Sequence, residues 1–328
     1  MAGETDKVTN SQVEYVPGMS MDLLPSTSTE WPEVSAMPFI LDTDIGFEPD
    51  DALALVLAAS LPNLSLIITS DECDNQRARL ARYLLEVLGR RDVPIVSGRE
   101  LDTEDNWSVE DMVPEYIPAQ PTGVVAAVQQ VLEQHDGQIG WIGLGPMSNL
   151  AIALSDIQGL RERLVVTQQE GAFRVAPDDR AERNIDLDVS SARDVLEAGI
   201  QPWIVPAGLS FHPLNAITEE SVEYQTLYDS VDPACVLLRL HLDMWLGYET
   251  SSPHLHGPLT LAQGIGMPFI TTIPASIDLD EFGRIRAGDH SVYMGQSVDY
   301  VEFRHWLSDK IKEIRSVIAR HPASEYRL

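Results

Sequence analysis

Cysteine and basic side chains are both scarce in this chain. Cys73 and Cys235 are the only cysteines among 328 residues, too few for a disulfide framework or a cysteine-based zinc site. This favours a reducing, intracellular compartment. Lysine and arginine number 22 against 51 acidic residues, which gives a net charge of −29. Such a charge repels phosphate backbones and anionic lipid surfaces, so we expect neither nucleic acid nor membrane partners.

Long apolar runs are absent as well. No stretch approaches the roughly 18 apolar residues of a membrane span, and the N-terminus has no basic segment followed by an apolar run. These absences predict a soluble, cytoplasmic protein. Hydrophobic residues still make up 44% of the chain, which is enough to fill a sizeable core.

Two regions of the chain differ in pattern. Residues 1–36 are rich in Ser, Thr, Pro and Glu without a clear period, and we predict a poorly ordered tail. In residues 37–328, short apolar runs alternate with helical patterns, which predicts a single α/β domain with a mostly parallel central sheet flanked by helices. The predicted strands are 39–41, 64–69, 94–96, 140–143, 164–166 and 203–205. The predicted helices are 52–61, 76–88, 124–134, 148–154 and 190–198, with helical additions around 217–248 and a closing helix at 301–318.

An acidic loop follows the first predicted strand. Asp42 and Asp44 stand two residues apart, so both carboxylates leave the same face of the strand's carboxyl end, where open α/β sheets bind ligands. Glu48, Asp50 and Asp51 follow just before an apolar helix. Aspartates also cap helices or stand solvated, and this alternative stays open for the Asp50-Asp51 pair. The whole cluster needs a cation or shared protons, and an all-oxygen set suits calcium or magnesium.

The acidic loop also carries a family resemblance. Asp42-Thr43-Asp44-Ile45-Gly46, followed by Asp50-Asp51-Ala52-Leu53-Ala54-Leu55, resembles the N-terminal signature of the inosine-uridine-preferring nucleoside hydrolases. The resemblance implies the nucleoside hydrolase fold and hydrolysis of the N-glycosidic bond of a ribonucleoside or modified nucleoside. It implies that Asp44 is a calcium ligand and the general base toward water, and that Asp51 is a second calcium ligand. Asp50 would bind a ribose hydroxyl, and Asp42 would support the metal ligands from behind. The spacer Phe47-Glu48-Pro49 is longer than the family usually has.

Other segments extend the resemblance over most of the chain. Gly143-Leu144-Gly145-Pro146 resembles a turn in which a backbone carbonyl, here that of Leu144, ligates calcium. Glu182 and Asn184 match residues that hold the sugar hydroxyls, and Asn75 stands where the family often places a ribose-binding residue. His256 matches a histidine that helps the leaving base depart, a task suited to a side chain that titrates near neutral pH.

The pattern breaks at three places. Gly257 stands where the family normally has an aspartate that ligates calcium. Because calcium takes about six to eight oxygens, the loss of this carboxylate predicts weaker metal binding. Gln169-Glu170-Gly171 replaces a usual Met-Gly-Gly beside the sugar, so that Gln169 is the expected substrate-binding residue there. Asn106-Trp107-Ser108 replaces a His-Gly segment.

Three hypotheses follow. The first is hydrolysis of a small nucleoside-like substrate with calcium as cofactor. The second is a repurposed homologue, whose acidic cluster grips a ribose-like or polyol ligand for a different reaction with an altered or absent metal site. The third is a non-catalytic binding protein. The leaving base stays open, because the aromatic residues at 224, 228, 245 and 248 either stack on a base or pack a helix. The family is commonly dimeric or tetrameric, so a homo-oligomer is also an open expectation.

Overall fold

The computed structural model describes residues 37–101, 107–169, 171, 181–248 and 252–317. The predicted tail, residues 1–36, lies outside this part of the chain, as do Asn106, Glu170 and residues 318–328. No helix within the described ranges is long and apolar enough to cross a membrane.

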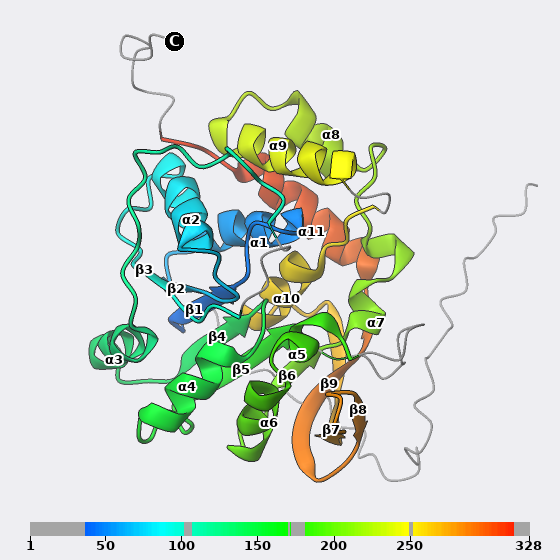
Figure 1. Cartoon of the computed structure of the whole chain (residues 1–328). Coiled ribbons are helices and arrows are strands. Elements are labelled where there is room, and N and C mark those ends of the chain that lie inside the picture. The colour runs from blue at the N-terminus through cyan, green and yellow to red at the C-terminus, as the bar shows by residue number, and fades with distance from the viewer. Residues whose placement is uncertain (1–36, 102–106, 170, 172–180, 249–251, 318–328) are drawn as a thin grey trace, which may run out of the picture.

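A nine-stranded sheet forms the centre of the fold, in the order β3-β2-β1-β4-β5-β6-β9-β7-β8 (Figure 1). The first six strands pair in parallel, as predicted. They are β1 Phe39–Thr43, β2 Leu64–Thr69, β3 Ile95–Ser97, β4 Ile139–Gly143, β5 Leu164–Gln169 and β6 Trp203–Val205. The sequence patterns did not predict the remaining three, β7 Ile270–Leu279, β8 Ile285–Ala287 and β9 His290–Val298. Strand β9 continues the parallel sheet beside β6, and β7 and β8 add an antiparallel end.

Helices cover both faces of the sheet, and each face has its own core (Figure 1). Successive residues of β1 point to opposite faces, so Phe39 and Leu41 join one core while Ile40 joins the other. The first core is covered by α1 Pro49–Ala59, α2 Gln76–Val87, α9 Pro233–Tyr248, α10 His256–Gly264 and α11 Tyr300–Glu313. The second is covered by α3 Val124–Gln134, α4 Ser148–Asp156 and α6 Val189–Glu197. Shorter helices are α5 Arg183–Leu187, α7 Ala207–Ser210 and α8 Val222–Asp229.

The predicted closing helix is too long at its C-terminal end. Helix α11 stops at Glu313, not at residue 318, because Ile314 has an extended backbone with ψ 128°. The apolar side chain of Ile314 continues the helical pattern in sequence and is buried, but it packs into the core from outside the helix.

Strand β1 lies between β2 and β4, and all three run in the same direction. In register, Thr43 pairs with Thr69 at the end of β2, and Asp42 pairs with Gly143 at the end of β4. The loops that follow these strands therefore meet at one edge of the sheet, where parallel α/β sheets bind their ligands.

Candidate active site

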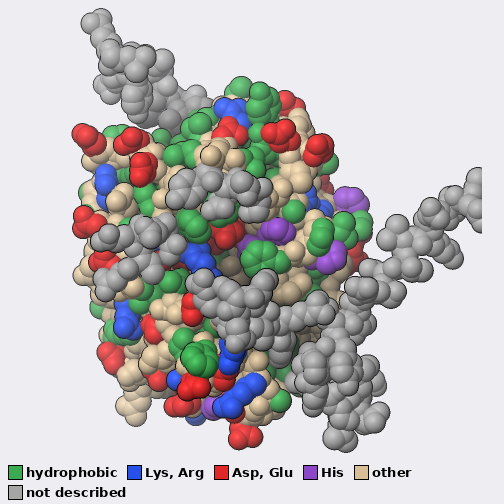
Figure 2. All heavy atoms as spheres, turned by 45° about the vertical axis from the view of Figure 1, so that its right-hand side comes forward, with side chains coloured by type: hydrophobic (Ala, Val, Ile, Leu, Met, Phe, Trp, Pro, Cys, Tyr) green, Lys and Arg blue, Asp and Glu red, His purple; other side chains and the backbone are tan. Residues whose placement is uncertain are grey.

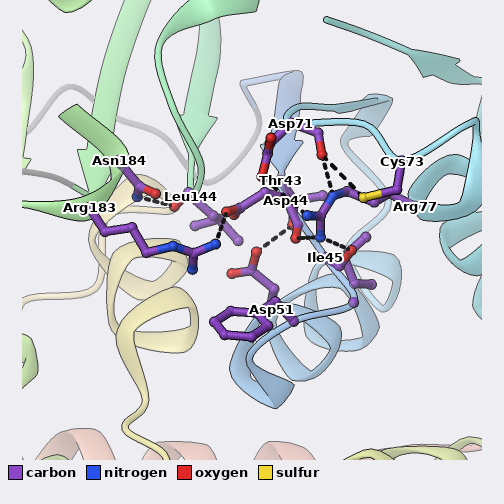
Figure 3. A network of polar contacts seen from close by, with 12 residues as sticks. Thr43, Asp44, Ile45, Asp51, Asp71, Cys73, Arg77, Leu144, Arg183 and Asn184 are labelled. Atoms are coloured by element: carbon purple, nitrogen blue, oxygen red, sulfur yellow. Dashed lines mark hydrogen bonds and ion pairs between the residues drawn. The ribbon is translucent and has the colours of Figure 1, made fainter. Parts of the chain in front are cut away.

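The acidic loop begins at the carboxyl end of β1 and is held by buried hydrogen bonds. Asp42 is buried, and its Oδ1 accepts a hydrogen bond from the Asn149 amide at 3.0 Å. Thr43 donates its hydroxyl to Asp51 Oδ2 at 2.9 Å, which ties the strand to the first turn of α1. Gly145, after β4, lies so close to Asp44 that a Cβ there would be 2.9 Å from Asp44 Oδ1. The predicted carboxylates at 42, 44 and 51 therefore come together, as Figure 3 shows for Asp44 and Asp51.

A fully buried arginine clamps the backbone of this loop (Figure 3). Arg77 Nη1 donates to the carbonyl of Asp44 at 2.5 Å and to that of Ile45 at 2.9 Å. Its Nη2 forms an ion pair with the equally buried Asp71 at 3.2 Å. Because both charges are paired and hydrogen-bonded, the guanidinium fixes the position of the Asp44 backbone without an unpaired buried charge.

The long spacer Phe47-Glu48-Pro49 is also firmly anchored. The Phe47 carbonyl accepts hydrogen bonds from Ser108 Oγ at 2.6 Å and from His241 Nε2 at 3.1 Å. The Phe47 ring meets Trp245 edge to face at 5.1 Å. Trp107 packs over Gly46, where a Cβ would clash with the Trp107 ring and where the φ of +108° independently favours glycine. The departure at Trp107-Ser108 thus supports the lengthened loop, and Trp245, one of the four aromatic candidates for base stacking, packs beneath it.

Helix α1 starts directly after this spacer. Glu48 is its N-cap residue with an extended backbone, and Pro49 presets the first helical φ. Asp50 and Asp51 fill the first turn, where the helix dipole favours negative charge. Asp50 Oδ2 accepts a hydrogen bond from the backbone N–H of Gly257 at 2.6 Å, which joins the loop to α10.

Burial shifts the pKa values of these carboxyl groups upward. It raises the pKa of Asp42 to about 7 and that of Asp50 to about 7. Burial, with the neighbouring charge of Asp50, raises the pKa of Glu48 to about 8. The pKa of Asp51 rises well above its ordinary value through burial, through the charges of Asp44 and Asp50, and through a hydrogen bond with the Asp44 side chain. The cluster is therefore short of compensating positive charge and retains protons near neutral pH.

Arg183 reaches this cluster from α5 (Figure 3). Its Nη2 lies 4.0 Å from Asp44 Oδ2, and its guanidinium carbon lies 4.6 Å from the centroid of the Phe47 ring. The Nη2 atom is buried and has no hydrogen-bond partner among the described residues. Neither a role for Arg183 nor one for Glu48 was predicted from the sequence. The signals in the sequence were an arginine between two predicted sugar-binding residues and an acidic residue in an unusually long spacer.

Of the predicted sugar-binding residues, Glu182 and Asn184 flank Arg183 and are engaged with the backbone, whereas Gln169 is engaged with a side chain. Glu182 caps α5 by accepting hydrogen bonds from the N–H groups of Asn184 and Ile185, and burial raises its pKa to about 7. Asn184 donates its amide to the carbonyl of Leu144 at 2.7 Å and to that of Gln169 at 3.2 Å. The Gln169 side chain accepts a hydrogen bond from Thr260 at 3.4 Å.

Asn75 is held elsewhere. Its amide donates to the carbonyl of Gln120 at 3.0 Å and accepts from the N–H of the same residue at 2.7 Å. Both polar ends of the side chain therefore fasten the loop around residue 120. In the described part of the chain, no hydrogen bond connects Asn75 with the carboxylate cluster.

His256 lies at the start of α10 against the cluster, with Nε2 3.8 Å from Glu48 Oε2. The expectation that it titrates near neutral pH is wrong, because burial and the neighbouring His254 lower the pKa of His256 to about 3. Its ring packs edge to face on Phe211 at 4.3 Å, and 57% of Phe211 is exposed. Figure 2 shows histidine and hydrophobic side chains next to one another on this face. The raised pKa of Glu48 and the lowered pKa of His256 favour a protonated Glu48 beside a neutral His256.

The oxygen donors fall short of those that calcium requires. The predicted calcium ligands are the carboxylates of Asp44 and Asp51 and the backbone carbonyl of Leu144. This carbonyl already accepts a hydrogen bond from the Asn184 amide. A Cβ at Gly257 would lie 3.0 Å from Asp51 Oδ1, so the missing carboxylate would have entered this cluster. In the described ranges, no three His, Cys, Asp or Glu side chains are grouped in a way that could hold a metal ion. This donor set does not fit calcium, which takes about six to eight oxygens.

The sequence model of the family described as "Inosine-uridine preferring nucleoside hydrolase" matches residues 39–310. Among curated relatives, the pyrimidine-specific ribonucleoside hydrolase RihA of Enterobacter sp. (strain 638) is 27% identical over 281 residues, which cover 77% of this chain and 87% of RihA.

Solved structures share the fold. A plant nucleoside hydrolase, PpNRh1, superposes with a TM-score of 0.72 at 20% identity and covers 84% of this chain and 99% of its own. The inosine-uridine preferring nucleoside hydrolase of Bacillus anthracis gives a TM-score of 0.71 at 16% identity, with 85% and 100% covered. The predicted fold class is thereby confirmed.

Proposed function

Because this chain belongs to the inosine-uridine preferring nucleoside hydrolase family, we propose that it hydrolyses the N-glycosidic bond of a ribonucleoside and releases ribose and the free base. The observation that carries the proposal is the placement of Asp44. Its carboxylate lies beside Asp51 at the ligand-binding edge of the sheet, and Arg77 fixes its backbone from below. A carboxylate held in this way can accept a proton from water as the water oxygen bonds to C1′ of the sugar.

The sugar is proposed to bind between α1 and α5. Asp50 and Glu182 each have a pKa raised to about 7 by burial, so near neutral pH each is available in a protonated form that donates a hydrogen bond and in an ionised form that accepts one. Sugar hydroxyls need both kinds of partner. The negative charge that remains on the cluster favours the positively charged, oxocarbenium-like transition state over the neutral substrate.

Glu48 and His256 are proposed to assist the leaving base together. When the C1′–N bond breaks, the base nitrogen takes up a proton. Glu48 holds a proton at neutral pH because its pKa is raised to about 8, whereas His256 is neutral. Glu48 Oε2 and His256 Nε2 are 3.8 Å apart, so a small movement would let Glu48 donate its proton to the imidazole or to the base. The exposed ring of Phe211, which packs on His256, offers the base an aromatic surface.

The test is release of ribose from a panel of purine and pyrimidine ribonucleosides. We expect turnover with at least one of them and a loss of about 10²- to 10⁴-fold in Asp44→Asn, the range attributed to a general base. Asp194→Asn is the matched control, since Asp194 is exposed on α6. Absence of ribose release from the whole panel would reject hydrolysis of these nucleosides.

Gly257 and Arg183 favour one second candidate, a reaction on the same sugar with a different acceptor or leaving group. Gly257 lacks the expected carboxylate and Arg183 brings a positive charge to the pocket, whereas Asp44 and Asp50 are present. Ribose binding measured by calorimetry, together with no turnover of any nucleoside, would support this candidate. A binding protein without any activity would give the same calorimetric result. In that case neither wild type nor Asp44→Asn would convert the bound ligand into a product.

A further inference from the structure

The acidic cluster contains one guanidinium that the family resemblance did not assign. We propose that Arg183 supplies the positive charge that this cluster requires and that the enzyme therefore works without a calcium ion. The inference rests on the proposed function, because it concerns the same site.

The position of Arg183 supports this role. Its Nη2 lies 4.0 Å from Asp44 Oδ2, and its charge also acts on the nearby carboxyl groups of Glu48 and Glu182. The guanidinium is held over the ring of Phe47 at 4.6 Å, a cation–π contact with a residue of the long spacer. Phe47 is itself fixed by Trp245 and by hydrogen bonds to its carbonyl. These contacts anchor the Phe47 ring on which the guanidinium of Arg183 lies.

The Nη2 atom of Arg183 is buried and can still bind a ligand, although the side chain as a whole is 34% exposed. Nη2 has no hydrogen-bond partner among the described residues, although it faces a carboxylate. A buried donor without a partner costs free energy unless a ligand or water satisfies it. A water molecule or a sugar hydroxyl between Nη2 and Asp44 would satisfy both groups, and this is where the attacking water must lie if Asp44 is its base. Arg183 is thus a positioning residue for the proposed base.

Gly257 leaves the acidic cluster with one negative charge fewer than the family pattern would give it. A carboxylate at this position would add a negative charge next to Asp51 and Asp50, because a Cβ there would lie 3.0 Å and 3.3 Å from their oxygens. The chain has no carboxylate at 257 and has a monovalent guanidinium at 183. A divalent ion on Asp44 would be repelled by the guanidinium on the same carboxylate, so a site built around one of these cations disfavours the other.

The first experiment measures the melting temperature and ribose release of the full-length protein in excess EDTA and in millimolar CaCl₂. We expect wild type to melt at the same temperature and turn over at the same rate in both. The double variant R183A/G257D, which restores the carboxylate and removes the guanidinium, is expected to melt about 5 °C higher in calcium at 100 times its dissociation constant. Arg161→Ala, an exposed arginine, is the matched control.

The second experiment is chemical rescue. Arg183→Ala is expected to lose about 10²- to 10³-fold in kcat, the cost of removing one preorganised donor, and to regain part of it in millimolar guanidinium but not in equal NaCl. A merely structural role of Arg183 would not respond to guanidinium.

Calcium-dependent melting of wild type, or loss of its turnover in EDTA, would overturn the proposal, and so would full activity of Arg183→Ala. If wild type releases no ribose from any nucleoside, the proposed function fails. The melting temperatures in EDTA and in CaCl₂ still decide whether calcium binds. A wild type that is insensitive to calcium beside a responsive double variant supports the charge replacement in either case.

Discussion

Asp42 offers the most direct test of how burial acts on the carboxylate cluster. Asp42 is 2% exposed, and burial raises the pKa of its carboxyl group from 3.8 to about 7. Because the folded-state pKa is the higher one, the folded state holds a proton on Asp42 over a pH range in which the unfolded chain has released it. The stability that results is fully present below about pH 4 and is lost as the pH rises through about 7. Protein stability should therefore fall between pH 5 and pH 8.

The size of the effect follows from the shift. Between pH 5 and the folded pKa of about 7 lie two pH units, and each is equivalent to 1.36 kcal/mol, so ionisation of Asp42 costs about 3 kcal/mol over this range. Asp42→Asn removes the titration but keeps an oxygen that accepts the hydrogen bond from Asn149. We expect the melting temperature of the variant relative to wild type to be roughly 5 °C higher at pH 8 than at pH 5.

The assay is thermal unfolding followed by fluorescence or circular dichroism in buffers from pH 5 to pH 8. Glu133→Gln, on the exposed side of α3, serves as the control and should follow wild type at every pH. If the difference between Asp42→Asn and wild type does not change with pH, Asp42 is already ionised at pH 5 in the folded protein. The assumption that burial dominates the electrostatics of this site would then be wrong.

Two further predictions concern the leaving base. Glu48→Gln should lower kcat by about 10²- to 10⁴-fold for natural nucleosides. The loss should be much smaller for a nitrophenyl riboside, because its leaving group needs no proton. An equal loss of kcat on both substrates would contradict the role of Glu48 as a proton donor. Phe211→Ala should raise KM for nucleosides about 2- to 10-fold, as loss of one aromatic stacking contact predicts. The affinity for ribose, measured by calorimetry, should not change. An unchanged KM would mean that the base does not bind on Phe211.

The parallel half of the fold was predictable because its strands are buried on both faces. Apolar runs such as Leu64–Thr69 and Trp203–Val205 agree with β2 and β6 at both ends. Strands β7 to β9 were missed for the opposite reason. They form the sheet's antiparallel end, where several residues are exposed, so neither a continuous apolar run nor a clean alternation marks them in the sequence.

The part of the candidate site that could be predicted consists of residues whose place is set by the strand or helix on which they lie. Asp42 lies in β1, Asp44 follows the strand, and Asp50 and Asp51 start α1, so the structure brings the four together. The pKa of His256 was not predictable, because it depends on burial by segments that are distant in sequence. The same holds for Asn75, whose amide binds a loop 45 residues away.

The departures from the family pattern are not independent of one another. The long spacer places the Phe47 ring under Arg183 and the Glu48 carboxyl beside His256. Trp107 and Ser108 support that spacer at Gly46 and Phe47. Gly257 then leaves the cluster with a charge that one guanidinium and retained protons can balance. The spacer and the adjoining Gly46 contact Trp107, Ser108, Arg183 and His256, and Gly257 contacts the carboxylates of the same cluster, as expected if the pocket had exchanged a metal-centred charge balance for one centred on Arg183 and Glu48. Gly257→Asp alone should therefore harm activity more than the double variant R183A/G257D does in the presence of calcium.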